Sequence, residues 1–290
     1  YEERSFEKVL RVRRDHAATT LTGGTGVRKW LMVNGTEMTK LTMITQHMGH
    51  LPMLLHQDKP TSALVICFGM GTTYRSLLNW GIDVTAIELV PGVKDAFSDF
   101  FDDAAGYLNH PKGRIIIDDG RRFLSMAPEK FDVITIDPPP PSEAAGSSLL
   151  YSVEFYELAK RRLKPGGILQ QWWAYGEKRT LEAVTRSITH SFPYVKVFQS
   201  IEGWGFHFIA SMSPIVVPSQ ESMMARIPER VQRDMMEWFT VKDLRLAVQW
   251  IKQRELAPPE EFLKNTKYVL ITDDRPFNEY FMLRRLWGYQ

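Results

Sequence analysis

The most informative pattern in the sequence is an unbroken run of mostly apolar residues from Ser62 to Phe68. A strand buried on both faces of a parallel sheet has this pattern, whereas a half-exposed strand alternates apolar and polar positions. Short β-type segments then alternate with helical ones, which is typical of parallel strands joined by crossover helices. We therefore predict an α/β fold with a doubly wound sheet, whose first strands are 62–68, 84–87, 114–117, 131–136 and 167–169.

Two later β-type segments, 195–198 and 206–210, differ from the others because only residues 200–205 separate them. A parallel connection needs a crossover of a dozen or more residues, so this short link predicts an antiparallel hairpin at the sheet edge. Pro165, Gly166 and Gly167 are expected to close a helix before the fifth strand.

The chain before and after this sheet has other patterns. Residues 9–13 and 30–33 are β-type and flank a glycine-rich turn, which predicts a small N-terminal antiparallel β unit. Apolar positions between Met43 and His56 recur at helical spacing, and the chain beyond about Pro214 is helical and charged. The expected organisation is an N-terminal β unit (1–40), a central sheet domain (41–212) and a helical C-terminal extension (213–290).

Suggestive residues follow the first two strands of the sheet. In doubly wound sheets, ligands bind beyond the carboxyl ends of the strands. Phe68-Gly69-Met70-Gly71 follows the first strand, and glycines there let the backbone turn tightly and approach a ligand. The third glycine of a dinucleotide fingerprint is missing, so a plain strand-to-helix turn stays open. Glu88 ends the next strand, where a carboxylate can accept hydrogen bonds from both ribose hydroxyls.

Acids also end the third and fourth predicted strands. Asp118-Asp119-Gly120 ends the third, where one acid can cap the following helix and another can accept from an adenine amine. Asp137 ends the fourth strand and precedes four prolines, which fix φ and stiffen the loop. We expect Asp137 to be held at the centre of the crevice.

Composition excludes several classes of function. A net charge of +2 without a long basic patch argues against nucleic-acid binding. The single cysteine, Cys67, excludes an internal disulfide and a cysteine-based zinc site. His47, His50 and His56 share a helical segment but lack a completing carboxylate, so we predict no metal site. No apolar stretch reaches the roughly 20 residues that cross a bilayer.

At these residues the chain resembles the spermidine synthase family of aminopropyltransferases. The resemblance extends from about Ser5 to Met212, and its landmarks occur in the family's order and spacing. They are Asn34-Gly35, His50-Leu51-Pro52-Met53-Leu54-Leu55-His56, Phe68-Gly69-Met70-Gly71, Ile87-Glu88-Leu89, Asp118-Asp119-Gly120, Phe131–Asp137 and Phe155-Tyr156.

The resemblance implies a Rossmann-like sheet of the S-adenosylmethionine-dependent methyltransferase type, with S-adenosylmethionine or its decarboxylated form as donor. Glu88 would then hold the ribose, Asp119 would face the adenine, and Asp137 would take the proton from the attacking amine. Methylthioadenosine would be released. The implied donor-binding residues are Phe68, Gly69, Met70, Gly71, Glu88, Leu89, Asp118, Asp119, Gly120, Asp137 and Pro138.

The sequence departs from the family on the acceptor side. The second acid of the family's Asp-x-x-Asp loop falls on Pro140, and its Tyr-x-Glu falls on Ile44 and Gln46. Burying a second ammonium without a partner is costly, so we expect a small-molecule amine other than putrescine. Candidate substrate residues are Gln46, Glu143, Gln171, Trp173 and Asp274. Of these, Gln171 and Trp173 could instead be core, and Asp274 belongs to a polar segment, 271–280, that could fold over the crevice or form an ion-paired cap.

Two other functions stay open. Asp137-Pro138-Pro139 is similar to the Asp-Pro-Pro-Tyr loop of amine methyltransferases, although the aromatic residue is absent. Loss of the polyamine-binding acids also fits a non-catalytic domain that senses a nucleoside. The chain further resembles the soluble portion of spermidine-synthase-like proteins that carry membrane-spanning helices ahead of it. The resemblance suggests a homodimer in the cytoplasm or at the cytoplasmic face of a membrane.

Overall fold

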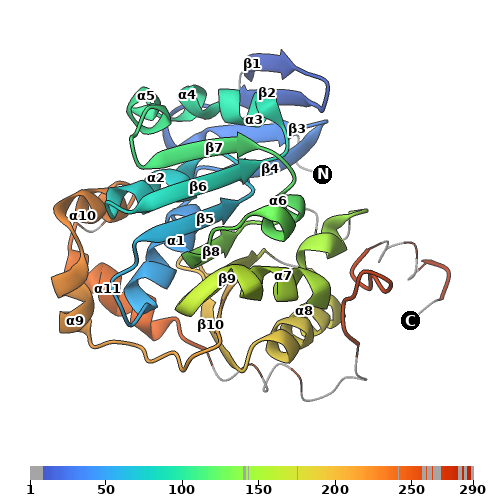
Figure 1. Cartoon of the computed structure of the whole chain (residues 1–290). Helices are drawn as coiled ribbons and strands as arrows, with labels where there is room; N and C mark the ends of the chain where they lie inside the picture. The colour runs from blue at the N-terminus through green and yellow to red at the C-terminus, as the bar shows by residue number, and fades with distance from the viewer. Residues whose placement is uncertain are drawn as a thin grey trace.

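The computed structural model describes residues 9–139, 142, 144–174, 176–240, 242–256, 259, 263, 269–279, 283 and 286–288. Two sheets organise this part of the chain (Figure 1). The larger has seven strands in the order β10-β11-β9-β8-β5-β6-β7. Its bounds are β5 (Ser62–Ile66), β6 (Asp83–Glu88), β7 (Gly113–Ile117), β8 (Phe131–Ile136), β9 (Leu163–Trp173), β10 (Tyr194–Gln199) and β11 (Phe206–Ser211).

The pairing confirms the predicted fold class. Strands β7, β6, β5, β8 and β9 are parallel, and β11 and β10 add an antiparallel hairpin at one edge. Because β5 lies between β6 and β8, chain order reverses direction on either side of it. Such a reversal leaves a crevice at the carboxyl ends of β5 and β8.

A four-stranded antiparallel sheet precedes the large one, as the resemblance and the pattern predicted. Its strands are β1 (Val9–Arg14), β2 (Thr19–Gly23), β3 (Trp30–Val33) and β4 (Thr36–Lys40), in chain order. Asn34 and Gly35 both have positive φ in the tight β3–β4 turn, a conformation that Asn and Gly tolerate best.

Helices cover both faces of the large sheet. Alternate side chains of β5 point to opposite faces, so Leu64 and Ile66 belong to one apolar cluster and Ala63 and Val65 to another. The first cluster includes residues of α6 (Gly120–Met126), α7 (Val153–Arg162) and α8 (Lys178–Ser191). The second includes residues of α2 (Thr72–Asn79), α3 (Pro91–Asp95), α4 (Phe97–Phe100) and α5 (Ala104–Leu108).

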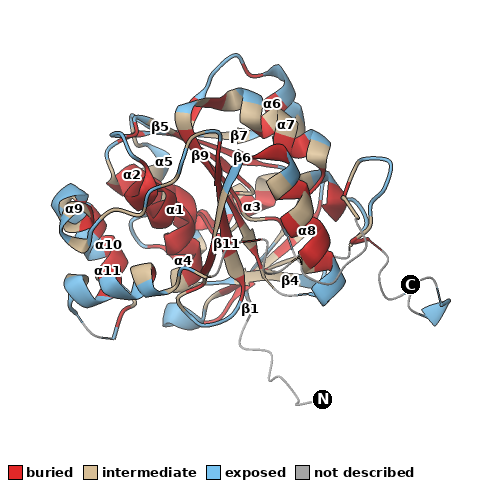
Figure 2. Ribbon diagram, turned by 90° about the horizontal axis from the view of Figure 1, so that it is seen from below, coloured by how far each residue is buried: buried red, intermediate tan, exposed pale blue. Residues whose placement is uncertain are grey.

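The helix α1 (Met43–Leu55) connects the two sheets and is buried along nearly its whole length (Figure 2). A third apolar cluster joins its residues Leu51 and Leu54 to the C-terminal helices α9 (Gln220–Arg226), α10 (Glu229–Met236) and α11 (Leu244–Gln253). These helices therefore pack on the sheet domain through shared apolar side chains.

One local prediction was wrong. Pro165, Gly166 and Gly167 lie inside β9 and do not close a helix, because α7 ends at Arg162 and β9 begins at the next residue. Lys160, Arg161 and Arg162 occupy the last turn of α7, where positive charges interact favourably with the helix dipole.

Candidate functional site

The glycine turn after β5 is built from backbone conformations that few residues adopt. Cys67, Gly69 and Gly71 all have positive φ, and Gly71 is the N-cap of α2. A Cβ on Gly71 would lie 2.5 Å from the ring of Phe97, whereas the space beside Gly69 is open. The side chains of Phe68 and Met70 are buried in the core, so the turn offers its backbone to the crevice.

Glu88 ties this turn to the end of β6. Its Oε2 accepts from the amides of Phe68 (3.0 Å) and Gly69 (3.3 Å), and its Oε1 accepts from the amide of Val90 (2.9 Å). Burial raises the pKa of the Glu88 carboxyl above its ordinary value, and these amides partly offset the shift. Leu89, in contrast, is 61% exposed at the strand tip.

The acids after β7 both have local partners. Asp119 is the N-cap of α6 and accepts from the amide of Arg122 at 2.7 Å. Asp118 accepts from the guanidinium of Arg122 at 2.6 Å and from the Asp119 amide at 2.8 Å. Gly120 is required here, since a Cβ would lie 2.5 Å from Cγ2 of Ile66. The helix-capping interpretation of Asp119 is therefore realised in the structure.

Carboxylates from three strand ends act on the thiol of Cys67 at the tip of β5. The pKa of the Cys67 thiol is raised well above its ordinary value, first by burial and then by the negative charges of Glu88, Asp137 and Asp119. Asp118 is not among these charges. The acids at the ends of β6, β7 and β8 thus converge on the tip of β5, as the strand topology requires.

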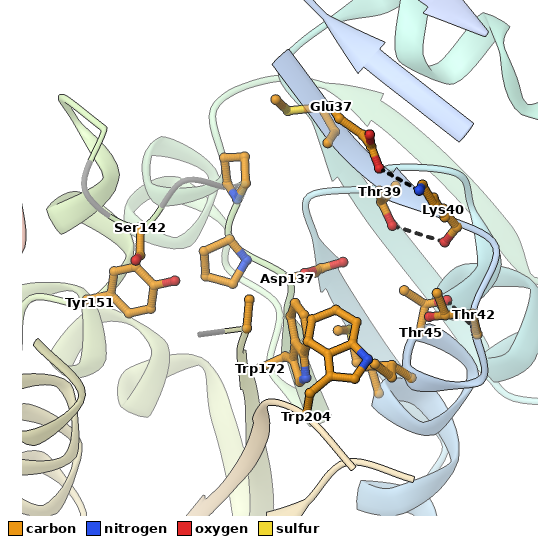
Figure 3. A pocket seen from close by; sticks show the side chains of 16 residues that line it. Glu37, Thr39, Lys40, Thr42, Thr45, Asp137, Ser142, Tyr151, Trp172 and Trp204 are labelled. Carbon is orange, nitrogen blue, oxygen red and sulfur yellow. Dashed lines mark hydrogen bonds and ion pairs between the residues drawn. The ribbon is translucent and has the colours of Figure 1, made fainter. Parts of the chain in front are cut away.

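Asp137 opens into a cavity of about 400 Å³ beside this point. Figure 3 shows Ser142 and Tyr151 on one side of Asp137 and Thr39, Lys40 and Glu37 on the other. The remaining wall comes from the start of α1, the end of β9 and the β10–β11 turn. The lining residues are Glu37, Met38, Thr39, Lys40, Thr42, Ile44, Thr45, Met48, Asp137, Pro138, Pro139, Ser142, Tyr151, Trp172, Ala174 and Trp204.

The Asp137 carboxyl is in a low-polarity environment. Burial raises its pKa to about 7. Apolar neighbours explain this, because Ile44, Met48 and the rings of Trp172 and Trp204 line the same cavity. A carboxyl that titrates near neutral pH can accept a proton from a substrate and later release it to water.

An aromatic wall beside Asp137 is formed by two tryptophans. Trp172 and Trp204 meet edge to face, with ring centroids 5.2 Å apart. Residues alternate between faces along β9, so Trp173 points the other way and packs against Tyr151 in the core. Within the described chain the indole Nε1 of Trp172 is buried without a hydrogen-bond partner.

Four of the five predicted substrate residues do not line this cavity. Gln46 is buried and donates to the carbonyl of Asp234 at 2.8 Å. Gln171 accepts from the hydroxyl of Tyr156 and donates to the carbonyl of Leu150, and Trp173 is a core residue. Asp274 is exposed in a turn, and Glu143 lies outside the described residues. We therefore do not retain Gln46, Gln171, Trp173 or Asp274 as substrate contacts.

The cavity is lined by other residues, which were not among the predicted substrate contacts. Tyr151 and Ser142 follow β8 in the loop, and Glu37 and Lys40 come from β4. Ile44, which stands where the family has tyrosine, lines the cavity near the start of α1. Alternation along β9 separates Trp172, which lines the cavity, from Trp173, and it distinguishes the two once one face of the strand is assigned.

Two kinds of feature are absent from the part of the chain that the structure describes. None of its helices combines the length and apolar composition that a membrane-spanning segment needs. No three of its His, Cys, Asp and Glu side chains are grouped as a metal site would require.

The family of the chain follows from comparison with known proteins. The model of the spermine/spermidine synthase domain matches residues 41–201, more than half of the chain. The chain belongs to this family. The matched range contains the glycine turn, Glu88, Asp119, Asp137 and Trp172.

Individual relatives within the family are distant. The chain is 30% identical over 190 residues to a polyamine aminopropyltransferase of Sulfurisphaera tokodaii, an alignment that covers 62% of this chain and 63% of that protein. It is 26% identical over 233 residues to the polyamine aminopropyltransferase of Thermoplasma volcanium, covering 78% and 83%. The match therefore spans less than two thirds of the first of these relatives.

Solved structures share the fold at low sequence identity. The spermidine synthase of Thermotoga maritima superposes with a TM-score of 0.62 at 20% identity, covering 78% of this chain and 87% of that one. Human methyltransferase-like protein 13 superposes with a TM-score of 0.50 at 16% identity, covering 70% and 93%. Both the predicted family resemblance and the methyltransferase-type fold are thus confirmed.

Proposed function

We propose that this protein is a transferase that moves the carbon chain beside the sulfonium of an S-adenosylmethionine-type donor onto a small amine. The observation that carries the proposal is the setting of Asp137, a carboxyl with a pKa of about 7 that opens into a 400 Å³ cavity at the switch point of the sheet. The printed names of the relatives, polyamine aminopropyltransferase and spermidine synthase, support the same class of reaction.

In this reaction, the Asp137 carboxylate takes a proton from the ammonium group of the acceptor. The freed nitrogen lone pair forms a bond to the donor carbon beside sulfur, and the carbon–sulfur bond breaks with its electron pair going to sulfur. The sulfonium thereby becomes a neutral thioether, which is methylthioadenosine for an aminopropyl donor. General-base catalysis of this kind contributes about 10²–10⁴-fold, and the alignment of the two reactants contributes further.

The donor side of the crevice has hydrogen-bonding capacity left. A carboxylate offers about four acceptor positions, and Glu88 uses three of them on backbone amides. In the proposed complex, Oε1, which has one of these three bonds, also accepts from a ribose hydroxyl. Asp119 uses Oδ1 to cap α6, and Oδ2 is available to accept from an adenine amine. The exposed apolar side chain of Leu89 fits the flank of a nucleoside.

The acceptor side suits one ammonium better than two. Among the described lining residues the only carboxylates are Asp137 and Glu37, and Glu37 is 3.3 Å from Nζ of Lys40. Ile44 adds an apolar group near the start of α1. Among these residues, the second ammonium of a diamine such as putrescine would therefore meet hydroxyl groups, apolar groups and a carboxylate that already pairs with Lys40. We propose a small amine whose remaining part is apolar or carries oxygen atoms.

A product assay tests this proposal. The protein is incubated with S-adenosylmethionine or its decarboxylated form and a panel of monoamines, diamines and amino acids, and the nucleoside product is identified by mass spectrometry. Methylthioadenosine supports the proposal. S-adenosylhomocysteine would instead assign a methyltransferase, and tight donor binding without turnover would assign a nucleoside-sensing domain.

A further inference from the structure

Residues 271–279, which we call the C-terminal strap, lie beside α7 and α8 (Figure 1). The helix and loop residues that they contact are far away in the sequence. The strap is fixed at its start by two hydrogen bonds. The amide of Ile271 donates to Oγ of Ser187 at 2.8 Å, and its carbonyl accepts from the amide of Val153 at 2.9 Å. Ile271 itself is fully buried in the apolar cluster under α8.

The middle of the strap contacts α6, the helix that Asp119 caps. Asp273 forms a two-pronged ion pair with the guanidinium of Arg121, with one contact at 2.7 Å, and accepts from Oγ of Ser152 at 2.8 Å. Arg121 holds the pKa of the Asp273 carboxyl below its ordinary value. Since Arg121 is two residues after Asp119, this pair anchors the turn that carries the proposed adenine contact.

The end of the strap holds the loop on the acceptor side. Asn278 is fully buried and donates to the carbonyl of Ser142 at 2.6 Å and to Oγ of Ser147 at 2.8 Å. Glu279 is 7% exposed and accepts from both the amide and the hydroxyl of Ser148. Ser142 lines the reaction cavity, and Tyr151 lies on the same loop.

From these contacts we infer that the C-terminal strap positions both sides of the reaction crevice, the donor turn through Asp273 and the acceptor wall through Asn278 and Glu279. A buried carboxylate is costly unless it is hydrogen-bonded. The hydrogen-bond donors to Glu279 come from the loop itself. The favourable energy of these hydrogen bonds therefore depends on the loop keeping one conformation. The strap residues act through Arg121 and through Ser142, Ser147 and Ser148, and they are positioning residues.

The inference rests on the proposed function for its kinetic consequence, but the coupling between strap and loop can be measured without any substrate. Hydrogen–deuterium exchange of peptides within 144–152 is compared between the wild type and Asn278→Ala, Glu279→Ala and Glu279→Gln. We expect at least tenfold faster exchange in the two alanine variants and substantial rescue by glutamine, which keeps an accepting oxygen. Asp274→Asn, a change in an exposed neighbour, is the matched control.

Kinetics then separate the two halves of the strap. Asn278→Ala should raise KM for the acceptor about tenfold with KM for the donor within twofold, and Asp273→Asn should do the opposite. Equal changes in both constants, or exchange in 144–152 that matches the control, would overturn the inference. If the wild type binds the donor without any turnover, the proposed function fails. The donor affinity of Asp273→Asn, measured by calorimetry, then replaces KM. An affinity equal to that of Asp274→Asn overturns the inference.

Discussion

Asp137 and Trp172 lie side by side at the carboxyl ends of two neighbouring parallel strands and line the same cavity. The register pairs Ile136 of β8 with Gln171 of β9, so the next residue of each strand reaches the crevice together. An ionisable acid thus sits against an aromatic wall. This relationship explains why the Asp137 carboxyl holds its proton up to about neutral pH.

Replacing Asp137 with asparagine should remove the proton acceptor and leave the cavity shape unchanged. We expect kcat to fall by about 10²–10⁴-fold while the affinity for the donor changes little. Single-turnover kinetics and calorimetric titration measure the two quantities. Wild-type kcat in this variant would exclude Asp137 as the base.

The pH dependence of the reaction should report the same group. Only the ionised carboxylate accepts a proton, so kcat/KM for the donor should rise with pH and level off above the pKa of about 7. The residual activity of Asp137→Asn should lack this inflection. A wild-type profile that stays flat from roughly pH 5.5 to 8.5, a range of about three units around the pKa, would contradict the assignment.

The effect of Asp137 on the free energy of unfolding should be opposite: stability should fall as pH rises, whereas activity rises. The folded state binds this proton more tightly than the unfolded state, whose carboxyl pKa is about 4. Folding stability is therefore lost as pH rises from about 4 to about 7 and changes no further above that. Asp137→Asn should be more stable than the wild type at pH 8 by at most about 4 kcal/mol, and nearly equal at pH 4. Urea unfolding at both pH values provides the comparison.

Substitutions of two neighbouring tryptophans, which lie on opposite faces of β9, should affect acceptor binding and folding stability separately. Trp172→Ala should raise KM for the acceptor about tenfold, because it removes cavity wall and the contact with Trp204. Trp173→Ala should instead cost about 3–5 kcal/mol of folding stability, since its ring is 1% exposed in the core. The opposite assignment of the two effects would show that the face of β9 has been misplaced.

Two glycines of the β5–α2 turn form a second matched pair. Gly69→Ala should cost about 1–2 kcal/mol of stability, because alanine disfavours its positive φ but meets open space. Gly71→Ala should add about 1–3 kcal/mol more, because its Cβ would clash with the ring of Phe97. Denaturant unfolding measures both, and equal losses would refute the clash.

The sequence by itself determined the fold and the main acids of the site. Continuous apolar runs such as 62–66 mark strands buried on both faces, and this signal is local in the chain. Parallel strands end at one edge of a sheet, so residues following successive strands had to converge there. Glu88, Asp119 and Asp137 could be found in this way.

The tertiary structure alone decided which side chains face the cavity and what holds its walls. Each face of β9 ends with a glutamine and a tryptophan, so alternation separates Trp172 from Trp173 without showing which of them faces the ligand. The pKa of Asp137 depends on burial by residues that come from α1, from β9 and from the β10–β11 turn. Asn278 and Ser142 are 136 positions apart, and no sequence pattern marks their hydrogen bond, because packing of the strap on α8 brings them together.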